Sequence, residues 1–270
     1  MKIYILCDME GITGLHDLRQ TWFSKDEENA KFAREGLKLL TDQLNWASEK
    51  ALEAGVDELF VCDTHAGGHN VPIEDLISDP RITYEPPNGA ELMTSMNESF
   101  DGLILLGHHA KANTENAFLS HTWTGSWADF RINDMSVGEI GIEACYAGHW
   151  NVPLIMVQGD RACCEEVNRQ FPDTVTAAVK WAVSGKKAQG PTIEEARELT
   201  AGKIKEAVVK ARNKSVKPFR PQLPMDIRLT LRDKEKADSI AKKDGVKRLD
   251  EFTVQVIENR HCDILKTIVG

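Results

Sequence analysis

Two carboxylates stand one residue apart in the stretch ILCDMEGITG, residues 5–14, directly after a run of apolar residues. If the chain stays extended there, Asp8 and Glu10 project to the same side, because side chains along a strand alternate with a period of two. Like charges that lie a few ångströms apart repel, and one of them normally takes up a proton unless a cation sits between them. The pair therefore either points into water or holds a metal ion.

Similar polar groups follow other apolar runs along the chain. The run ELFVCD ends in Asp63 and is followed by His65, and the run GLILLG is followed by His108 and His109. In an open parallel sheet, groups at the carboxyl ends of the strands gather at one edge. Carboxylates and imidazoles at one edge suit zinc better than magnesium, which prefers oxygen ligands and water. The residues alone leave open the alternative that these are ordinary polar ends of strands.

The elements that position these groups follow a strand-then-helix rhythm. Apolar residues spaced three and four apart form one stripe from Ala30 to Ala54, which predicts a helix with a capping box at Ser24 and Glu27 and an end near Gly55. Such alternation predicts an α/β fold with a parallel-rich sheet covered by helices. The short apolar runs that predict buried strands occupy 2–7, 58–63, 102–107 and 153–160, and a further predicted helix occupies 137–150.

The pattern of charged and apolar residues changes after about residue 190. A charged amphipathic helix is predicted over 192–214, and two strands with half-exposed alternation are predicted at 225–231 and 251–258, with a Lys-rich helix between them. We therefore divide the chain into an α/β catalytic core with the metal site, 1–190, and a smaller C-terminal α+β lobe, 191–270. The lobe is expected to complete the domain or to contribute subunit contacts.

The bulk composition argues against several classes of protein. The 270 residues are 41% apolar and 28% charged, which is enough for a sizeable core. A formal net charge of −9 argues against nucleic acid or an anionic membrane as the partner. No apolar run approaches the roughly 20 residues of a membrane span, and the first apolar run is too short for a secretory signal. We expect a cytoplasmic protein whose six cysteines are reduced thiols.

Taken together, the motifs resemble the D-aminopeptidases of the dipeptide-transport operon type, a small group of zinc peptidases. The resemblance covers most of residues 1–185, and the motifs occur in the family's order at matching spacing. They are D-M-E-G-I-x-G at 8–14, D-[ST]-H at 63–65, G-x-H-A at 107–110, S-H at 120–121, N-D-x-x-V-G-E-x-G at 133–141, A-G-x-x-x-V-P at 147–153 and G-D at 159–160.

This resemblance implies a site with two zinc ions per chain. Asp8 would bridge both ions. Glu10 and His65 would complete the ligand set of one ion, and His109 and Glu139 would complete the ligand set of the other. The register of the G-x-H-A motif selects the second histidine of the adjacent pair as the ligand.

The resemblance also implies that His121 is the catalytic histidine, which the family treats as the nucleophile or its equivalent. A water activated by two metal ions is available as a nucleophile at neutral pH. Histidine side chains exchange protons in the same pH range. We therefore favour an acid–base role for His121, while direct attack by its imidazole stays open.

Four further residues near these motifs have open roles. Asp160 is expected either to bind the amino group of a substrate or to be an ordinary loop acid. Asp63 is expected to hydrogen-bond a ligating imidazole, as carboxylates behind metal ligands commonly do. Trp123 and Trp127 stand beside His121 and could line the substrate pocket, form a subunit contact or lie in the core.

The leading hypothesis is a zinc-dependent aminopeptidase that acts on short peptides with a free N-terminus. Its preference for D-residues and its assembly into a homo-oligomer, with a decameric ring as the candidate form, are implied by the resemblance alone. One alternative is a two-metal phosphoesterase, for which Lys111 and Arg131 are the basic residues nearest to the ligand turns. Another is a non-enzymatic metal-binding or assembly protein that keeps the same fold.

Overall fold

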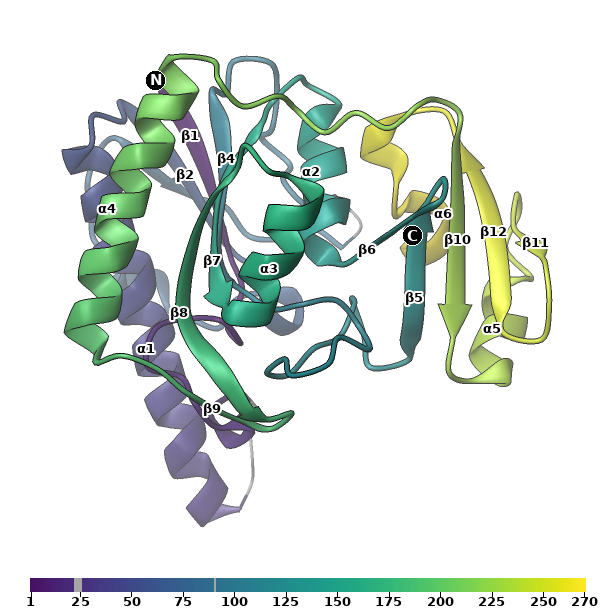
Figure 1. Cartoon of the computed structure of the whole chain (residues 1–270), viewed down its shortest axis with the longest axis horizontal. Coiled ribbons are helices and arrows are strands. Elements are labelled where there is room, and N and C mark those ends of the chain that lie inside the picture. Colours follow the sequence, from purple (N-terminus) through teal and green to yellow (C-terminus); the bar gives the residue numbers. More distant parts are fainter. Residues whose placement is uncertain (22–25, 90) are drawn as a thin grey trace.

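A seven-stranded sheet forms the centre of the molecule (Figure 1). It is seen in a computed structural model, which describes residues 1–21, 26–89 and 91–270. Neighbouring strands pair in parallel, except that the last strand pairs antiparallel with the one beside it. From one edge to the other the strands are β3 (Ile82–Tyr84), β2 (Glu58–Asp63), β1 (Lys2–Cys7), β4 (Gly102–His108), β7 (Leu154–Asp160), β8 (Val175–Ser184) and β9 (Lys187–Gln189).

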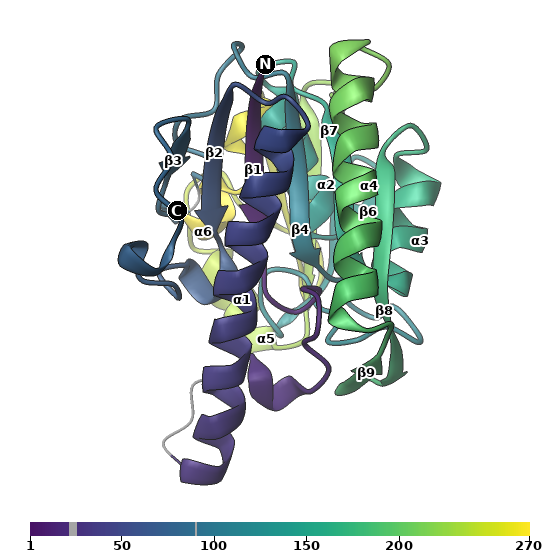
Figure 2. The ribbon, with the colours of Figure 1, turned by 90° about the vertical axis from the view of Figure 1, so that its left-hand side faces the viewer.

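Helices cover both faces of this sheet, and this explains the continuous apolar runs of its central strands. Along β1, Ile3 and Ile5 pack into a core with α1 (Glu27–Glu53) and α4 (Ile193–Arg212), which stand in front of the sheet in Figure 2. Tyr4 and Leu6 point to the opposite face and pack into a core with α2 (Glu139–Gly148) and α3 (Arg161–Gln170). The expected α/β class, with a parallel-rich sheet covered by helices, is confirmed.

The longest helix, α1, follows the predicted apolar stripe. Its cap is Asp26, whose side chain accepts a hydrogen bond from the backbone N–H of Asn29. The predicted cap at Ser24 lies outside the described residues. Gly55 follows Ala54, the C-cap residue of the helix. Its φ of +93° is a left-handed conformation, which favours glycine.

A second, five-stranded antiparallel sheet packs against the α2 side of the molecule. It combines the two predicted strands of the C-terminal region with a hairpin that stands between β4 and α2 in the sequence. The remaining helices are α5 (Lys234–Ile240) and α6 (Lys266–Val269). The sheet order is β11 (Lys247–Arg248), β12 (Thr253–Glu258), β10 (Met225–Leu231), β5 (Trp127–Ile132) and β6 (Met135–Val137). Single turns of 3-10 helix occupy η1 (Leu18–Gln20), η2 (His65–Gly67), η3 (Ile73–Asp75) and η4 (His261–Asp263).

The two sheets exchange segments of the chain. The helix α4, which lies in the predicted C-terminal lobe, packs on the first sheet beside α1, whereas β5 from the predicted core pairs with β10 of the second sheet. The division into 1–190 and 191–270 stays a prediction, and these pairings cross it. The strands β3, β5, β6, β8, β9 and β11 were not predicted.

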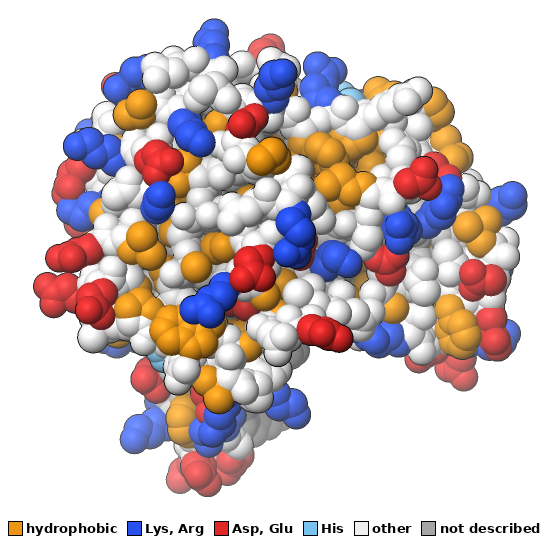
Figure 3. All heavy atoms as spheres, in the orientation of Figure 1, with side chains coloured by type: hydrophobic (Ala, Val, Ile, Leu, Met, Phe, Trp, Pro, Cys, Tyr) orange, Lys and Arg blue, Asp and Glu red, His pale blue; other side chains and the backbone are white. Residues whose placement is uncertain are grey.

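The surface carries mixed charge. On the face shown in Figure 3, Lys and Arg side chains alternate with Asp and Glu side chains among the described residues. This mixture of positive and negative side chains differs from the uniformly basic surface that binds nucleic acid. Within the described ranges, none of the helices is long and apolar enough to cross a bilayer.

The loops that follow β1 and β4 touch backbone to backbone. The N–H of Gly11 donates to the carbonyl oxygen of Gly107 over 2.6 Å. A Cβ atom on Gly11 would lie 2.1 Å from the carbonyl oxygen of His108. This close approach places the residues after β1 directly against the residues after β4.

We predict that Gly11→Ala lowers the free energy of unfolding by about 3 kcal/mol, because the new methyl group can be accommodated only if one backbone moves away from the other. Gly202→Ala is the matched control: this glycine is exposed within α4, and nothing lies within 4 Å of its added Cβ. The control should raise the free energy of unfolding by about 1 kcal/mol. Urea denaturation of both variants checks this, and equal stability of Gly11→Ala and the wild type would contradict the close approach.

Candidate metal centre

Three neighbouring strands bring the predicted metal ligands to one edge of the parallel sheet. Asp8 and Glu10 follow β1, His65 follows β2, and His109 follows β4. Because β1 lies between β2 and β4 and all three run in parallel, their carboxyl ends meet. All four side chains are buried. The expected convergence of residues that are far apart in the sequence is therefore present.

On one side of Asp8, the ring of His65 lies between two carboxylates. Its Nδ1 atom is 3.2 Å from Oδ1 of Asp8 and 3.2 Å from Oε2 of Glu10. Its Nε2 atom is 3.1 Å from the carbonyl oxygen of Thr21. A carbonyl oxygen only accepts hydrogen bonds, so Nε2 carries a proton and the neutral ring presents the Nδ1 lone pair to both carboxylates.

On the other side of Asp8, the ring of His109 has the same kind of surroundings. Its Nε2 atom is 3.3 Å from Oδ2 of Asp8 and 3.3 Å from Oε1 of Glu139, the first residue of α2. Its Nδ1 atom donates to the carbonyl oxygen of Ala110 over 3.0 Å. In the described structure Nε2 is buried and has no hydrogen-bond partner. When the ring is neutral, its Nε2 atom therefore directs a lone pair at two carboxylates.

Asp8 is shared between the two histidines, with one oxygen toward each ring. Burial alone would raise the pKa of Asp8, but the imidazoles of His109 and His65 outweigh burial and hold the pKa well below its usual range. Burial alone would lower the pKa of His65, but the carboxylates of Glu10 and Asp8 outweigh it and raise the pKa to about 11. For His109, Glu139 and Asp8 likewise overcome burial and raise the pKa well above its ordinary value. The site strongly favours positive charge.

These donors fit a divalent cation. The potential ligand atoms of Asp8, Glu10 and His109 all lie within 4.8 Å of one another, as do those of His109, His121 and Glu139. An imidazole lone pair that faces two carboxylates is repelled unless a proton or a cation lies between them, and the hydrogen bond of His109 to Ala110 leaves that position open at Nε2. Imidazole nitrogen and carboxylate oxygen are the ligands that Zn²⁺ takes in proteins.

His121 lies beside this centre and is more accessible than the ligands. Its ring stacks on the ring of His109 with centroids 4.0 Å apart, and its Nε2 atom is 3.8 Å from Oε1 of Glu139. Its Nδ1 atom donates to the carbonyl oxygen of Leu119 over 2.9 Å, which leaves the Nε2 lone pair facing the centre in the neutral ring. The side chain is 30% exposed. A group in this position can exchange a proton with a bound molecule.

The loop that carries His121 is fixed to the ligands. The backbone N–H of Trp123 donates to Oε1 of Glu139 over 2.8 Å, and the N–H of Ala112 donates to the hydroxyl of Thr122 over 3.0 Å. Trp127 is buried in the core, and Trp123 is partly buried with its ring 6.2 Å from that of Trp127. Of the open roles for the two tryptophans, the core is established for Trp127.

The carboxylates of Asp63 and Asp160 both bond to backbone N–H groups. The carboxylate of Asp63 accepts from the backbone N–H groups of His65 and Asn70, so it fixes the turn and does not contact a ligating ring. The carboxylate of Asp160 is buried and accepts from the backbone N–H groups of Phe118 and Cys163. Both oxygens of Asp160 have backbone partners, which supports a structural role, and its contact with a substrate stays a prediction.

Two buried groups near the centre were not predicted from the sequence. Nε2 of His108 lies 2.7 Å from Oε2 of Glu143, which stands one helical turn after Glu139 on α2. Burial alone would lower the pKa of His108, but Glu143 outweighs it and raises the pKa to about 9. The spacing of Glu139 and Glu143, four residues apart on one helix face, was the signal that could have found this pair.

Lys180, in the middle of β8, is the second missed group. It is fully buried, and its ammonium donates to the backbone carbonyl oxygens of Glu10 and Leu15 over 2.8 and 2.5 Å. Burial lowers the pKa of Lys180 to about 7, against the opposing effect of the Asp160 and Glu10 carboxylates. A lone lysine within a strand of alternating pattern looks like an ordinary surface residue, so no sequence signal was available.

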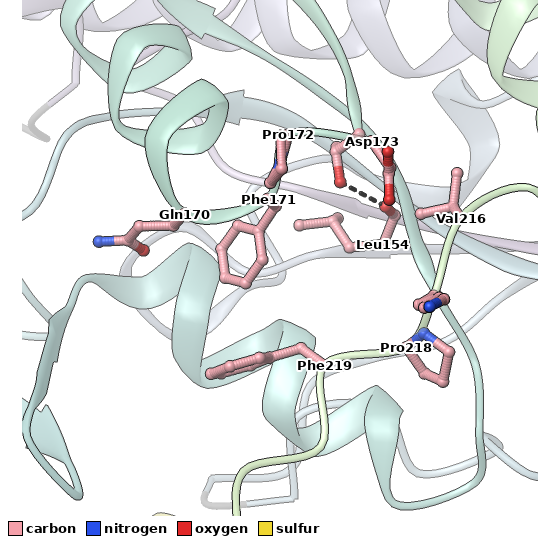
Figure 4. A pocket seen from close by; sticks show the side chains of 10 residues that line it. Leu154, Gln170, Phe171, Pro172, Asp173, Val216, Pro218 and Phe219 are labelled. Atoms are coloured by element: carbon pink, nitrogen blue, oxygen red, sulfur yellow. Dashed lines mark hydrogen bonds between the residues drawn. The ribbon is translucent and has the colours of Figure 1, made fainter.

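A cleft of about 190 Å³ is lined by Gln170, Phe171 and Phe219, among others (Figure 4). Its lining includes Leu154 at the amino end of β7, whereas the metal ligands follow the carboxyl ends of the strands. The rings of Phe171 and Phe219 meet edge to face there, 5.1 Å apart. This cleft is separate from the candidate metal centre.

Comparisons with known proteins point to one family. The sequence matches the D-aminopeptidase family over residues 1–269. It is 33% identical to a D-aminopeptidase of Bacillus subtilis (strain 168) over 184 residues, a segment that makes up 68% of this chain and 65% of that relative's length. The structure is similar to that of the zinc-dependent D-aminopeptidase DppA from Bacillus subtilis, a self-compartmentalizing protease. The TM-score is 0.87 at 27% identity, over 99% of this chain and 95% of that one.

We predict that Zn²⁺ uptake by the metal-free protein at pH 7 releases about two protons per chain, because the raised pKa values keep His65 and His109 protonated and a ligating imidazole must lose that proton. The apparent Zn²⁺ affinity should therefore rise with pH. In the metal-free protein the sign is opposite: the stabilisation from the His65 imidazolium is full below the unfolded pKa of about 6.5 and is lost as pH rises through about 11.

Isothermal titration calorimetry in buffers of different ionisation enthalpy counts the released protons. His65→Ala should release about one proton fewer than the wild type. His69→Asn, at an exposed histidine, is the control and should release the wild-type number. Uptake of Zn²⁺ without proton release would contradict the assigned surroundings of both rings.

Proposed function

The chain belongs to the D-aminopeptidase family, as the motifs indicated, and we propose that it is a zinc-dependent aminopeptidase acting on short peptides with a free N-terminus. The relatives that it resembles in sequence and in structure are D-aminopeptidases, and the structural relative is zinc-dependent. These likenesses support a preference for peptides that begin with a D-residue.

One observation carries the proposal: two buried histidines each direct a ring nitrogen at a pair of carboxylates, and Asp8 belongs to both pairs. A single cation would leave one ring nitrogen and its carboxylate neighbours without a compensating charge. We therefore propose two zinc ions per chain, with Asp8 between them. Glu10 and His65 would hold one ion, and His109 and Glu139 would hold the other.

The chemistry at this centre is hydrolysis of a peptide bond. When bound, zinc ions supply Lewis acidity and make a water molecule acidic enough to act as a nucleophile at neutral pH. His121 is in reach to take a proton from the attacking water at Nε2 and to pass it to the leaving amine. The hydrogen bond from its Nδ1 atom to Leu119 keeps the Nε2 lone pair directed at the centre.

Attack by the imidazole of His121 itself is the alternative mechanism. Both roles use the Nε2 lone pair, which lies in the plane of the ring and is not covered by the stacked contact with His109. We favour the acid–base role for His121, because a water activated by metal ions already supplies the nucleophile.

We also propose that the protein is a homo-oligomer in the cytoplasm, and a decameric ring is the form to test. The similarity to a self-compartmentalizing protease supports assembly. All six cysteines are free thiols, and five of them are buried, which suits a reducing compartment.

The phosphoesterase alternative has less support at the centre. The ammonium of Lys111 donates to the hydroxyl of Ser136, and the guanidinium of Arg131 bonds to the carboxylate of Asp129. These two basic side chains therefore already have partners, whereas a phosphate group needs donors that are free to bind it.

A panel of substrates tests the proposed function. We expect the zinc-loaded protein to release the first residue from D-Ala-D-Ala and related D-peptides and to leave N-acetylated copies uncleaved, because a free amino group defines an aminopeptidase. Matched L-peptides measure the chiral preference, and amino-acid release is followed by chromatography. Phosphate release from a phosphomonoester would favour the second function. Silence across the panel, together with tight zinc uptake, would favour a metal-binding assembly protein.

Two substitutions separate proton transfer from metal binding. His121→Ala should retain both zinc ions and lose about 100-fold or more in kcat, because general acid–base catalysis contributes about that much. Asp8→Ala should lose both ions and all turnover, because its two oxygens face both rings. Elemental analysis and peptide hydrolysis give the two readouts, and His69→Asn is the control. Full activity of His121→Ala would refute its assigned role.

A further inference from the structure

Two neighbouring strands carry buried groups of opposite charge side by side, one at the end of β7 and one in the middle of β8. Asp160 on β7 and Lys180 on β8 are register partners, and both side chains are buried. Each bonds to a different functional loop. We propose that the two are separate positioning residues for the reaction: Lys180 holds the loop of the metal ligands Asp8 and Glu10, and Asp160 holds the loop of His121. This inference rests on the proposed function.

The Lys180 contact fixes the loop after β1 at two points. Its ammonium bonds to the carbonyl oxygen of Glu10 and to that of Leu15, five residues later. The carboxylate of Glu10 lies 3.2 Å from His65 Nδ1, so the position of its backbone sets the position of a metal ligand. Without the ammonium, two buried carbonyl oxygens would lose these hydrogen bonds. The loop would then have to move to find new ones.

The Asp160 contact fixes the loop of His121 in an analogous way. One oxygen accepts from the N–H of Cys163 at the start of α3, and the other accepts from the N–H of Phe118 over 3.1 Å. The next residue, Leu119, supplies the carbonyl oxygen that accepts from His121 Nδ1. Leu119 has a φ of +52°, a conformation that a leucine keeps only when its neighbours hold it.

The side chain of Phe118 joins the two contacts. It is fully buried, and its ring lies 5.4 Å from the ammonium of Lys180, while its backbone is held by Asp160. Phe118 therefore contacts both Lys180 and Asp160. Because the hydrogen bonds of Lys180 and Asp160 go to different loops, the two residues should affect different steps.

Zinc titration tests the first half of the proposal. Lys180→Met removes the ammonium and keeps the length of the side chain. We expect the zinc affinity of the metal-free variant to fall about 10- to 100-fold, as for other residues that orient metal ligands, with excess zinc restoring turnover. Lys180→Gln, which retains an amide donor, gives a second variant with the same expected direction. Competition with a chromophoric chelator measures the affinity.

Peptide hydrolysis and NMR test the second half. Asp160→Asn keeps one oxygen for Cys163 but turns an amide NH₂ toward the N–H of Phe118. We expect kcat to fall about 10- to 100-fold while KM and zinc affinity stay within about threefold, because a small displacement of a reacting group has an effect of this size. Long-range ¹H–¹⁵N spectra should show changed resonances for the ring of His121, a signature that a purely structural role would not produce.

Val179→Ala is the matched control, because it truncates a buried side chain one residue before Lys180 on the same strand. It should lower thermal stability and leave zinc affinity and kcat near their wild-type values. The proposal is overturned if both variants change zinc affinity and kcat together in proportion to their loss of stability, or if neither quantity moves. If the wild type cleaves no peptide, the proposed function fails, yet the zinc titrations and the spectra still decide the two positioning roles.

Discussion

The structure depends on the electrostatics around one carboxylate. Asp8 is buried between two imidazoles, and each imidazole also faces a second buried acid. Carboxylates in this environment would normally repel one another or take up protons. Here the two rings are held by hydrogen bonds to backbone carbonyl groups, so their free nitrogen atoms point into the acidic cluster. Positive charge at these two positions is what allows the acids to remain together.

The sheet supplies the geometry for this cluster. Parallel pairing of β1 with β2 and β4 puts three loops at one edge, and the close approach at Gly11 and Gly107 presses two of them together. The second sheet contributes by holding β5 and β6 between the loop of His121 and the start of α2. The positions of the side chains at the centre therefore depend on pairing between distant strands, since no single segment of the chain contains all of these side chains.

The sequence allowed the strand ends and their ligands to be predicted because both follow local rules. An apolar run that stops at Asp8 or at His109 indicates a buried strand and a polar edge without any knowledge of the rest of the chain. The family resemblance added the pairing of Glu139 with His109. What could not be predicted depends on contacts between distant residues: Asp160 bonds to two backbone groups, and Lys180 reaches across the sheet to the loop after β1.

The strand β5 shows the same limit for the fold. Residues 127–137 lie between two elements of the first sheet, and nothing in their spacing indicates that they pair with β10, which begins at Met225. The predicted boundary near residue 190 was based on a change in the pattern of charged and apolar residues. In the structure, elements from both sides of that boundary pack in each sheet. Composition reports local solvent exposure, and it does not report which strand lies beside which.

The wide spacing of the donors along the chain has a consequence for biosynthesis. The first donor stands at residue 8 and the last at residue 139, so more than half of the polypeptide must leave the ribosome before the set can close around an ion. The lysine that steadies the first loop emerges later still, at position 180. The full set of donors therefore comes together only after the central strands have paired.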